Sequence, residues 1–90
     1  MLKALENLCN LAQARKKNPK EGSYTNKLLN DKPLCKAKVL EEINELIEAV
    51  EKDSNKIHEA ADVFYHLIIY LEANNININE VMAELENRKR

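Results

Sequence analysis

Hydrophobic residues along this chain recur at intervals of three and four, the spacing of one face of an α-helix. Short segments rich in Asn, Asp, Gly and Pro separate these stretches. The pattern predicts five helices, over residues 2–17, 23–29, 34–52, 55–73 and 77–90. We therefore expect an all-α helical bundle, folded as a single domain over residues 1–90.

The third and fourth predicted helices form the centre of this bundle. Asp53, Ser54 and Asn55 have turn-forming side chains, so the two flanking helices are expected to run antiparallel. The segment 60–73 is apolar around most of its circumference, the pattern of a buried helix. The apolar face predicted for the third helix consists of Val39, Leu40, Ile43, Leu46, Ile47 and Val50.

Chain length and composition limit the class of protein. The chain has 90 residues, 44% of them hydrophobic, with one Gly and two Pro, which favours a small helical domain over a sheet protein. A chain this short buries only a modest core, so we expect association with further copies to complete the bundle.

The charge distribution excludes several partners. The chain has 14 basic and 15 acidic residues and no dominant basic stripe, so we expect no nucleic-acid binding.

No apolar run approaches the roughly 18 residues of a membrane span, and the N-terminus lacks a signal-peptide core. The two cysteines, Cys9 and Cys35, lack metal or redox spacing and are expected to be reduced thiols. The expected location is the cytoplasm.

Two acidic clusters carry the candidate chemistry. Glu41, Glu42 and Glu45 lie on the third predicted helix, and Glu59 and Asp62 lie on the fourth. Acids three residues apart share a helix face, and Glu45 and Asp62 are nearly equidistant from the turn. Because like charges gather in a partly dry place only with a cation, this arrangement predicts an oxygen-ligand site for Mg²⁺.

Other interpretations of these acids remain open. Asp62 in an apolar helix needs a partner, and a buried salt bridge to Lys38 or His66 is the alternative to a metal. The acids of the third helix are also typical of a solvated face. Glu42/Glu45 and Glu45/Glu48 are both pairs three apart, and we favour the first because Glu42 lies at the edge of the apolar face.

The loop that contains the only glycine precedes a short helix. Ser23 follows Gly22 and is expected to cap this helix, which ends at Leu29. Exposed amides with Ser23, Thr25 and Lys27 also match the needs of a phosphate site, although plain helix capping explains the same residues. Four basic residues lie just upstream: Arg15, Lys16, Lys17 and Lys20.

Three stretches in order resemble a known family. They read Gly-Ser-Tyr-Thr-x-Lys-Leu from Gly22, Lys-x-x-Glu-Glu-x-x-Glu from Lys38, and Glu-Ala-Ala-Asp-x-x-Tyr-His from Glu59. Together they resemble phosphoribosyl-ATP pyrophosphohydrolase of histidine biosynthesis, within the wider all-α, MazG-like nucleotide pyrophosphohydrolases. The first stretch points to the narrower family. One departure is Leu40, where many members have Gly before the acidic pair.

The resemblance implies Mg²⁺-dependent cleavage of phosphoribosyl-ATP into phosphoribosyl-AMP and pyrophosphate by a helical homodimer. The implied metal ligands are Glu42, Glu45, Glu59 and Asp62. The implied catalytic acids are Glu41, Glu42 and Glu45, with Glu41 as a nearby acid that either supports a metal ligand or orients the attacking water. The implied substrate-binding residues are Ser23, Tyr24, Thr25, Lys27, Lys38 and His66.

Two other functions remain as alternatives. The first is a MazG-like enzyme that acts on a (deoxy)nucleoside triphosphate, because the acidic motifs serve both families. The second is a helical interaction module without enzymatic activity, whose acids are solvated or salt-bridged. A di-iron carboxylate bundle is disfavoured, because it needs Glu-x-x-His pairs and His66 follows Asp62 by four residues.

Overall fold

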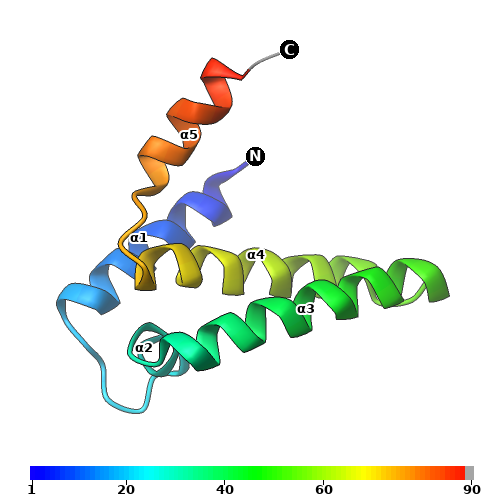
Figure 1. The fold of residues 1–90 in the computed structure, drawn as a ribbon, viewed down its shortest axis with the longest axis horizontal. Helices are drawn as coiled ribbons and strands as arrows, with labels where there is room; N and C mark the ends of the chain where they lie inside the picture. Colours follow the sequence, from blue (N-terminus) through cyan, green and yellow to red (C-terminus); the bar gives the residue numbers. More distant parts are fainter. Residues whose placement is uncertain (89–90) are drawn as a thin grey trace.

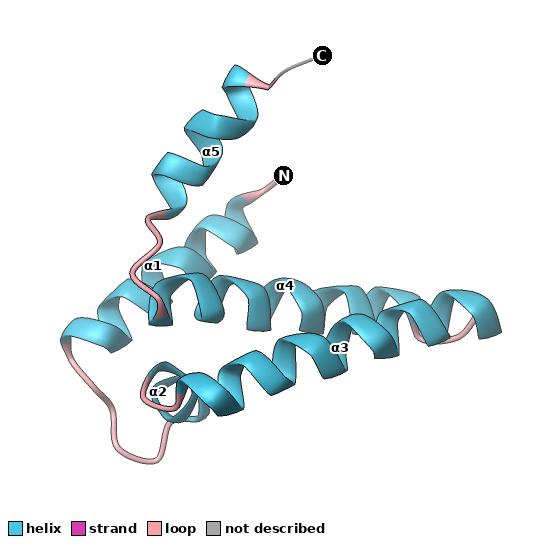
Figure 2. Ribbon diagram, viewed as in Figure 1, coloured by secondary structure: helices cyan, strands magenta, loops and turns pink. Residues whose placement is uncertain are grey.

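The computed structural model describes residues 1–88 and contains five α-helices and no strand within that range. The helices are α1 (Lys3–Lys17), α2 (Tyr24–Leu29), α3 (Lys32–Lys52), α4 (Lys56–Ala73) and α5 (Ile78–Asn87) (Figures 1 and 2). The predicted all-α fold is confirmed. The end of the fifth predicted helix, at 89–90, lies outside the described residues.

Helix ends follow the side chains that bond exposed backbone groups. Ser23 caps α2 by accepting a hydrogen bond from the backbone N–H of Asn26, as predicted. The predicted start of α3 is wrong by two residues. Asp31 caps that helix and accepts from the N–H of Leu34, which places Pro33 in its first turn. Proline is tolerated there because its missing N–H would have no helical partner.

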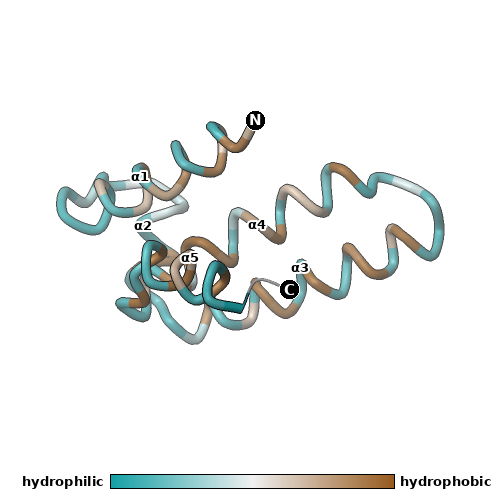
Figure 3. Tube along the Cα trace, turned by 90° about the horizontal axis from the view of Figure 1, so that it is seen from above, coloured by the Kyte–Doolittle hydropathy of each residue, from teal (hydrophilic) through white to brown (hydrophobic). Residues whose placement is uncertain are grey.

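The central antiparallel pair is formed by α3 and α4, which make the most extensive helix contact in the fold. Figure 3 shows the two helices side by side, joined at one end by a short turn. Asp53 and Asn55 in this turn both adopt left-handed backbone conformations, with φ of 52° and 56°. Asp and Asn tolerate that region better than most residues, so the local sequence suits the reversal.

The hydrophobic core lies at the end of the pair that is remote from this turn. There α2 packs against α1, α3 and α4, and Leu28, Cys35 and Ile69 are fully buried. Seven buried residues form the core cluster: Ala12, Leu28, Leu29, Cys35, Ile68, Ile69 and Ala73. This packing fixes the start of α2 against the middle of α4, where Tyr24 and Thr25 bond His66 and Tyr65.

The predicted inward apolar face of α3 is wrong. Residues at a spacing of seven, Cys35, Glu42 and Ala49, are the ones that α3 buries. Four residues of the predicted face remain 38–57% exposed: Leu40, Ile43, Ile47 and Val50. The small side chains of Cys35 and Ala49 allow close approach of the helices, which the bulkier stripe would prevent. The bulkier stripe is left facing outward.

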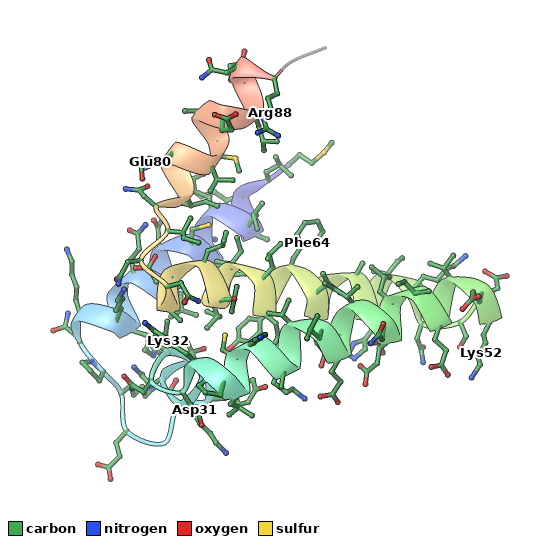
Figure 4. All side chains as sticks on the ribbon, viewed as in Figure 1. Asp31, Lys32, Lys52, Phe64, Glu80 and Arg88 are labelled. Atoms are coloured by element: carbon green, nitrogen blue, oxygen red, sulfur yellow. The ribbon has the colours of Figure 1, made fainter. Side chains whose placement is uncertain are left out.

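Burial along α4 is uneven, although the apolar pattern of residues 60–73 predicts a buried helix. His66, Ile68, Ile69 and Ala73 are buried near its C-terminal end. Ile57 and Phe64, nearer the turn, are 88% and 55% exposed. Phe64 projects from the side of α4 that faces away from α3 (Figure 4).

Helix α5 extends away from the central pair, and its main contacts are with α4 (Figure 1). Ile78 packs against the core, whereas Met82 and Leu85 are exposed. Asn75, in the left-handed conformation with φ of 59°, and the cap residue Asn77 separate α5 from α4, as their sequence predicts. Within residues 1–88, no helix combines the length and apolar character needed to cross a bilayer.

Candidate active site

Acidic side chains of α3 and α4 meet across the hairpin. Glu45 approaches Glu42 on its own helix and Glu59 on α4 closely enough to raise the pKa of both by hydrogen bonding and charge repulsion. Asp62 lies near enough to Glu42 and Glu59 to raise the pKa of both by charge repulsion. The structure therefore brings the four predicted metal ligands together. The partner of Glu45 across the hairpin is Glu59, one helical turn before Asp62.

Two carboxylate oxygens in this cluster are buried without a hydrogen-bond partner among the described residues, Glu42 Oε2 and Glu59 Oε2. Glu42 as a whole is only 6% exposed. A buried carboxylate without a partner is costly, and a divalent cation bound by oxygen ligands removes that cost. The unpaired oxygens and the all-carboxylate donor set fit a hard cation such as Mg²⁺.

Glu42 and Glu59 resist ionisation in the metal-free protein. Burial is the main cause that raises the pKa of each above its ordinary value of 4.5. The hydrogen bond to Glu45 and repulsion from its charge raise both values further. His66 lowers the pKa of Glu42 and His58 lowers that of Glu59, but the net shift is upward for both.

Raising the pH above about 4.5 should destabilise the metal-free protein. The raised pKa of Glu42 and Glu59 means that the folded state binds these protons more tightly than the unfolded state. This stabilisation is fully present below the unfolded-state pKa and is lost as the pH rises through the folded-state pKa.

Thermal unfolding between about pH 4 and pH 8 in a chelator tests this expectation. The melting temperature of the wild type should fall relative to that of Glu42→Gln, which lacks one titrating group. Added Mg²⁺ should oppose the fall, because it binds the ionised carboxylates. Parallel pH profiles for the two proteins would contradict the prediction.

Lys38 lies beside the acidic cluster. Its Nζ is 3.1 Å from Glu41 Oε2 and 3.8 Å from Glu42 Oε1. The hydrogen bond to Glu41 is the main cause that raises the pKa of Lys38. The salt bridge from Asp62 to Lys38, offered as the alternative to a metal, is not among the ion pairs of residues 1–88, because Lys38 pairs with Glu41 and Glu42 instead. Because Glu42 Oε2 still lacks a partner, this pair does not satisfy the buried carboxylate.

His66 is buried and links α4 to α2. Its Nδ1 lies 2.7 Å from the backbone oxygen of Asp62, so this nitrogen carries a proton and donates it. Its Nε2 lies 3.0 Å from the Tyr24 hydroxyl, and the two groups share a hydrogen bond. His66 therefore bonds the backbone of Asp62, whereas the carboxylate of Asp62 lies 3.4 Å from His58 Nε2.

Tyr65 and Thr25 make a second link between α4 and α2. The Tyr65 hydroxyl is 2.5 Å from Thr25 Oγ1, and the Tyr24 and Tyr65 rings stack with an interplanar angle of 13°. Thr25 is only 7% exposed. Its predicted contact with a substrate phosphate does not fit this geometry, because the hydroxyl is already bonded and covered. Thr25 instead anchors α2 to the helix that carries the acids.

The loop before α2 borders an open cleft of about 740 Å³. Gly22 has a φ of 81°, in the left-handed region that glycine adopts without strain. Lys20, Ser23, Tyr24 and Lys27 are among the residues that line the cleft. Through its bond to His66, Tyr24 connects this cleft to the acidic helix pair.

Three residues of the site did not emerge from the sequence. Asn26 is buried, accepts from the Lys20 N–H at 2.7 Å and donates to the Arg15 carbonyl oxygen at 2.9 Å, so it holds the loop in place. Neither periodicity nor charge marks this asparagine. Tyr65 belongs to the stretch that begins at Glu59, but nothing in the sequence indicates its hydrogen bond to Thr25. The third residue is His58. Its spacing of four from Asp62 could have indicated that the two side chains share a helix face.

Comparison with known proteins identifies relatives over nearly the whole chain. The sequence profile of the family described as phosphoribosyl-ATP pyrophosphohydrolase matches residues 5–89. A phosphoribosyl-ATP pyrophosphatase of Listeria welshimeri is 42% identical over 88 residues, covering 94% of this chain and 84% of the relative. One from Cereibacter sphaeroides is 43% identical over 91 residues, covering 98% and 88%.

A fused relative shows the same similarity. The histidine biosynthesis bifunctional protein HisIE of Pyrococcus furiosus is 40% identical over 90 residues, which cover 99% of this chain and 43% of that protein. No solved structure shows significant similarity to the chain.

Proposed function

This chain belongs to the phosphoribosyl-ATP pyrophosphohydrolase family, and on that premise we propose that it hydrolyses phosphoribosyl-ATP to phosphoribosyl-AMP and pyrophosphate. The reaction is a step of histidine biosynthesis and depends on Mg²⁺. The observation that carries the proposal is the cross-helix acid cluster, in which buried oxygens of Glu42 and Glu59 lack partners. Mg²⁺ that arrives with a polyphosphate substrate supplies the positive charge that these oxygens require.

The acids of both helices have separate tasks in this proposal. Glu42, Glu45, Glu59 and Asp62 would hold Mg²⁺, which when bound neutralises charge on the polyphosphate and acidifies a nucleophilic water. Glu41 is half exposed at the edge of the cluster, where its carboxylate can orient that water and accept its proton. Lys38, which bonds Glu41, offers a cation to the phosphates.

The cleft beside α2 is proposed to hold the other anionic end of the substrate. Phosphoribosyl-ATP carries a ribose phosphate as well as a triphosphate, so a selective enzyme needs a second anion site. Lys27 is exposed and lines the cleft together with Lys20 and Ser23. Charge-assisted contacts from such groups hold a phosphate monoester. Tyr24 and His66 join this cleft to the acid cluster.

Incubation of the purified protein with phosphoribosyl-ATP and Mg²⁺ tests the function directly. Pyrophosphate and phosphoribosyl-AMP should form in equal amounts, and a chelator should stop their formation. Release of inorganic phosphate instead, or preferential turnover of dUTP, dCTP or ATP, would overturn the assignment in favour of the wider nucleotide pyrophosphohydrolases.

We further propose that the active unit is a homodimer. Large apolar side chains lie exposed on α3, on α4 and just before α1: Leu2, Ile43, Ile47, Val50, Phe64 and Leu67. An apolar groove of about 350 Å³ between the start of α1 and α4 is lined by Leu2, Leu5 and Phe64, among others. Exposed apolar surface of this extent is typical of a protein interface.

Light scattering should give twice the mass of the chain, and Phe64→Lys should shift the protein towards the monomer because a charge would enter the interface. Retention of the wild-type mass by that variant would exclude Phe64 from the interface, and a monomeric wild type would end the dimer proposal.

A further inference from the structure

His58 lies next to the acid cluster and is neither a predicted metal ligand nor a predicted substrate-binding residue. It lies in the first turns of α4, four residues before Asp62, so both side chains leave the same face of the helix. Its Nε2 is 3.4 Å from Asp62 Oδ2. One ligand atom from each of His58, Glu59 and Asp62 lies within 4.8 Å of the others.

This spacing suits two ligands of one metal ion. Two metal–ligand bonds of roughly 2.1 Å that meet at a right angle place their ligand atoms about 3.0 Å apart. The observed 3.4 Å between His58 Nε2 and Asp62 Oδ2 therefore needs only a small side-chain adjustment. The His58 side chain is 72% exposed, so no packing opposes such a rotation.

A second observation links His58 to a ligand rather than to Asp62 alone. The neighbouring Glu59 carries a buried Oε2 without a partner among residues 1–88, and Glu42, 6% exposed, presents a second one. A plain surface pair between His58 and Asp62 leaves both oxygens unsatisfied. A cation bound by the cluster and reached by His58 satisfies them.

We infer that His58 supplies an imidazole nitrogen to the metal site and so strengthens its binding of transition-metal ions while leaving Mg²⁺ binding unchanged. This inference rests on the proposed metal site. Mg²⁺ gains little from a nitrogen ligand, whereas divalent ions from Mn²⁺ through Co²⁺ to Ni²⁺ gain progressively more. The carboxylates of the site bind every one of these ions, and His58 adds binding affinity that differs from one ion to the next.

The test compares metal affinities of wild type and His58→Asn, measured by calorimetry with Mg²⁺, Mn²⁺, Co²⁺ and Ni²⁺. Asn keeps a polar side chain but is too short to place an atom where Nε2 lies, and it removes the imidazole. The loss of affinity in the variant should grow along that series, from no change for Mg²⁺ to about tenfold or more for Ni²⁺. Lys56→Asn, in the same turn of α4 and paired with Asp53, is the matched control and should bind all four ions as the wild type does.

Pulsed electron paramagnetic resonance of the Mn²⁺-loaded protein gives a readout independent of activity. A directly bound imidazole nitrogen couples to Mn²⁺, and this coupling should disappear in His58→Asn. The chain has two histidines, so a signal that persists in the variant assigns the nitrogen to His66 and overturns the inference. Equal affinities of both proteins for every ion overturn it as well. Failure of the wild type to bind Mg²⁺ at all would instead reject the proposed metal site.

Discussion

Replacing Asp62 by Asn should lower phosphoribosyl-ATP hydrolysis by more than about a hundredfold while the protein remains folded. Asp62 lies in the acid cluster, near both Glu42 and Glu59, and repels their charges. Loss of its carboxylate removes a proposed metal ligand and therefore weakens Mg²⁺ binding. It also removes repulsion, so the metal-free variant should melt no earlier than the wild type.

The combination of lost activity and retained stability distinguishes a functional carboxylate from a structural one. Asp53→Asn is the matched control, because Asp53 is an exposed acid at the hairpin turn and lies outside the cluster. Asn tolerates its left-handed conformation, so this variant should keep full activity. Wild-type turnover by Asp62→Asn, or an equal loss in both variants, would reject the assigned role of Asp62.

Replacing Lys27 by Ala should reduce kcat/KM for phosphoribosyl-ATP by about ten- to a hundredfold, the equivalent of one charge-assisted contact of roughly 1.5–3 kcal/mol. Lys27 is exposed, lines the cleft beside α2 and has no carboxylate partner among the ion pairs of residues 1–88. Metal affinity should hardly change, because Lys27 lies outside the acid cluster.

Kinetics with phosphoribosyl-ATP, dUTP, dCTP and ATP show whether the loss is specific to the second phosphate. Lys36→Ala, an exposed lysine on α3 outside this cleft, is the matched control and should leave kcat/KM unchanged. Ser23→Ala should cost about 1 kcal/mol of stability, because the Ser23 hydroxyl caps α2. Intact phosphoribosyl-ATP turnover by Lys27→Ala would remove Lys27 from the substrate site.

Local features of the sequence determined the helices and the acids of the site. Hydrophobic spacing located the four longer helices, and the capping residue Ser23 located α2, because a cap depends on its own local backbone and side-chain bonds. Acids three residues apart on a helix share a face whatever surrounds them, but this spacing fits Glu45 with Glu48 as well as with Glu42. The position of Glu42 at the edge of the apolar face favoured the pair Glu42/Glu45.

Only the tertiary structure decided which helix faces are buried and which hydroxyls are free. Cys35 and Ala49 allow α3 to approach α4 closely, so the bulkier stripe that includes Ile43 and Ile47 faces outward. Thr25, which resembles a phosphate ligand in the sequence, bonds Tyr65 forty residues away. Spacing along one helix cannot show which face meets another helix, because that choice depends on side-chain volumes and hydrogen bonds contributed by distant segments of the chain.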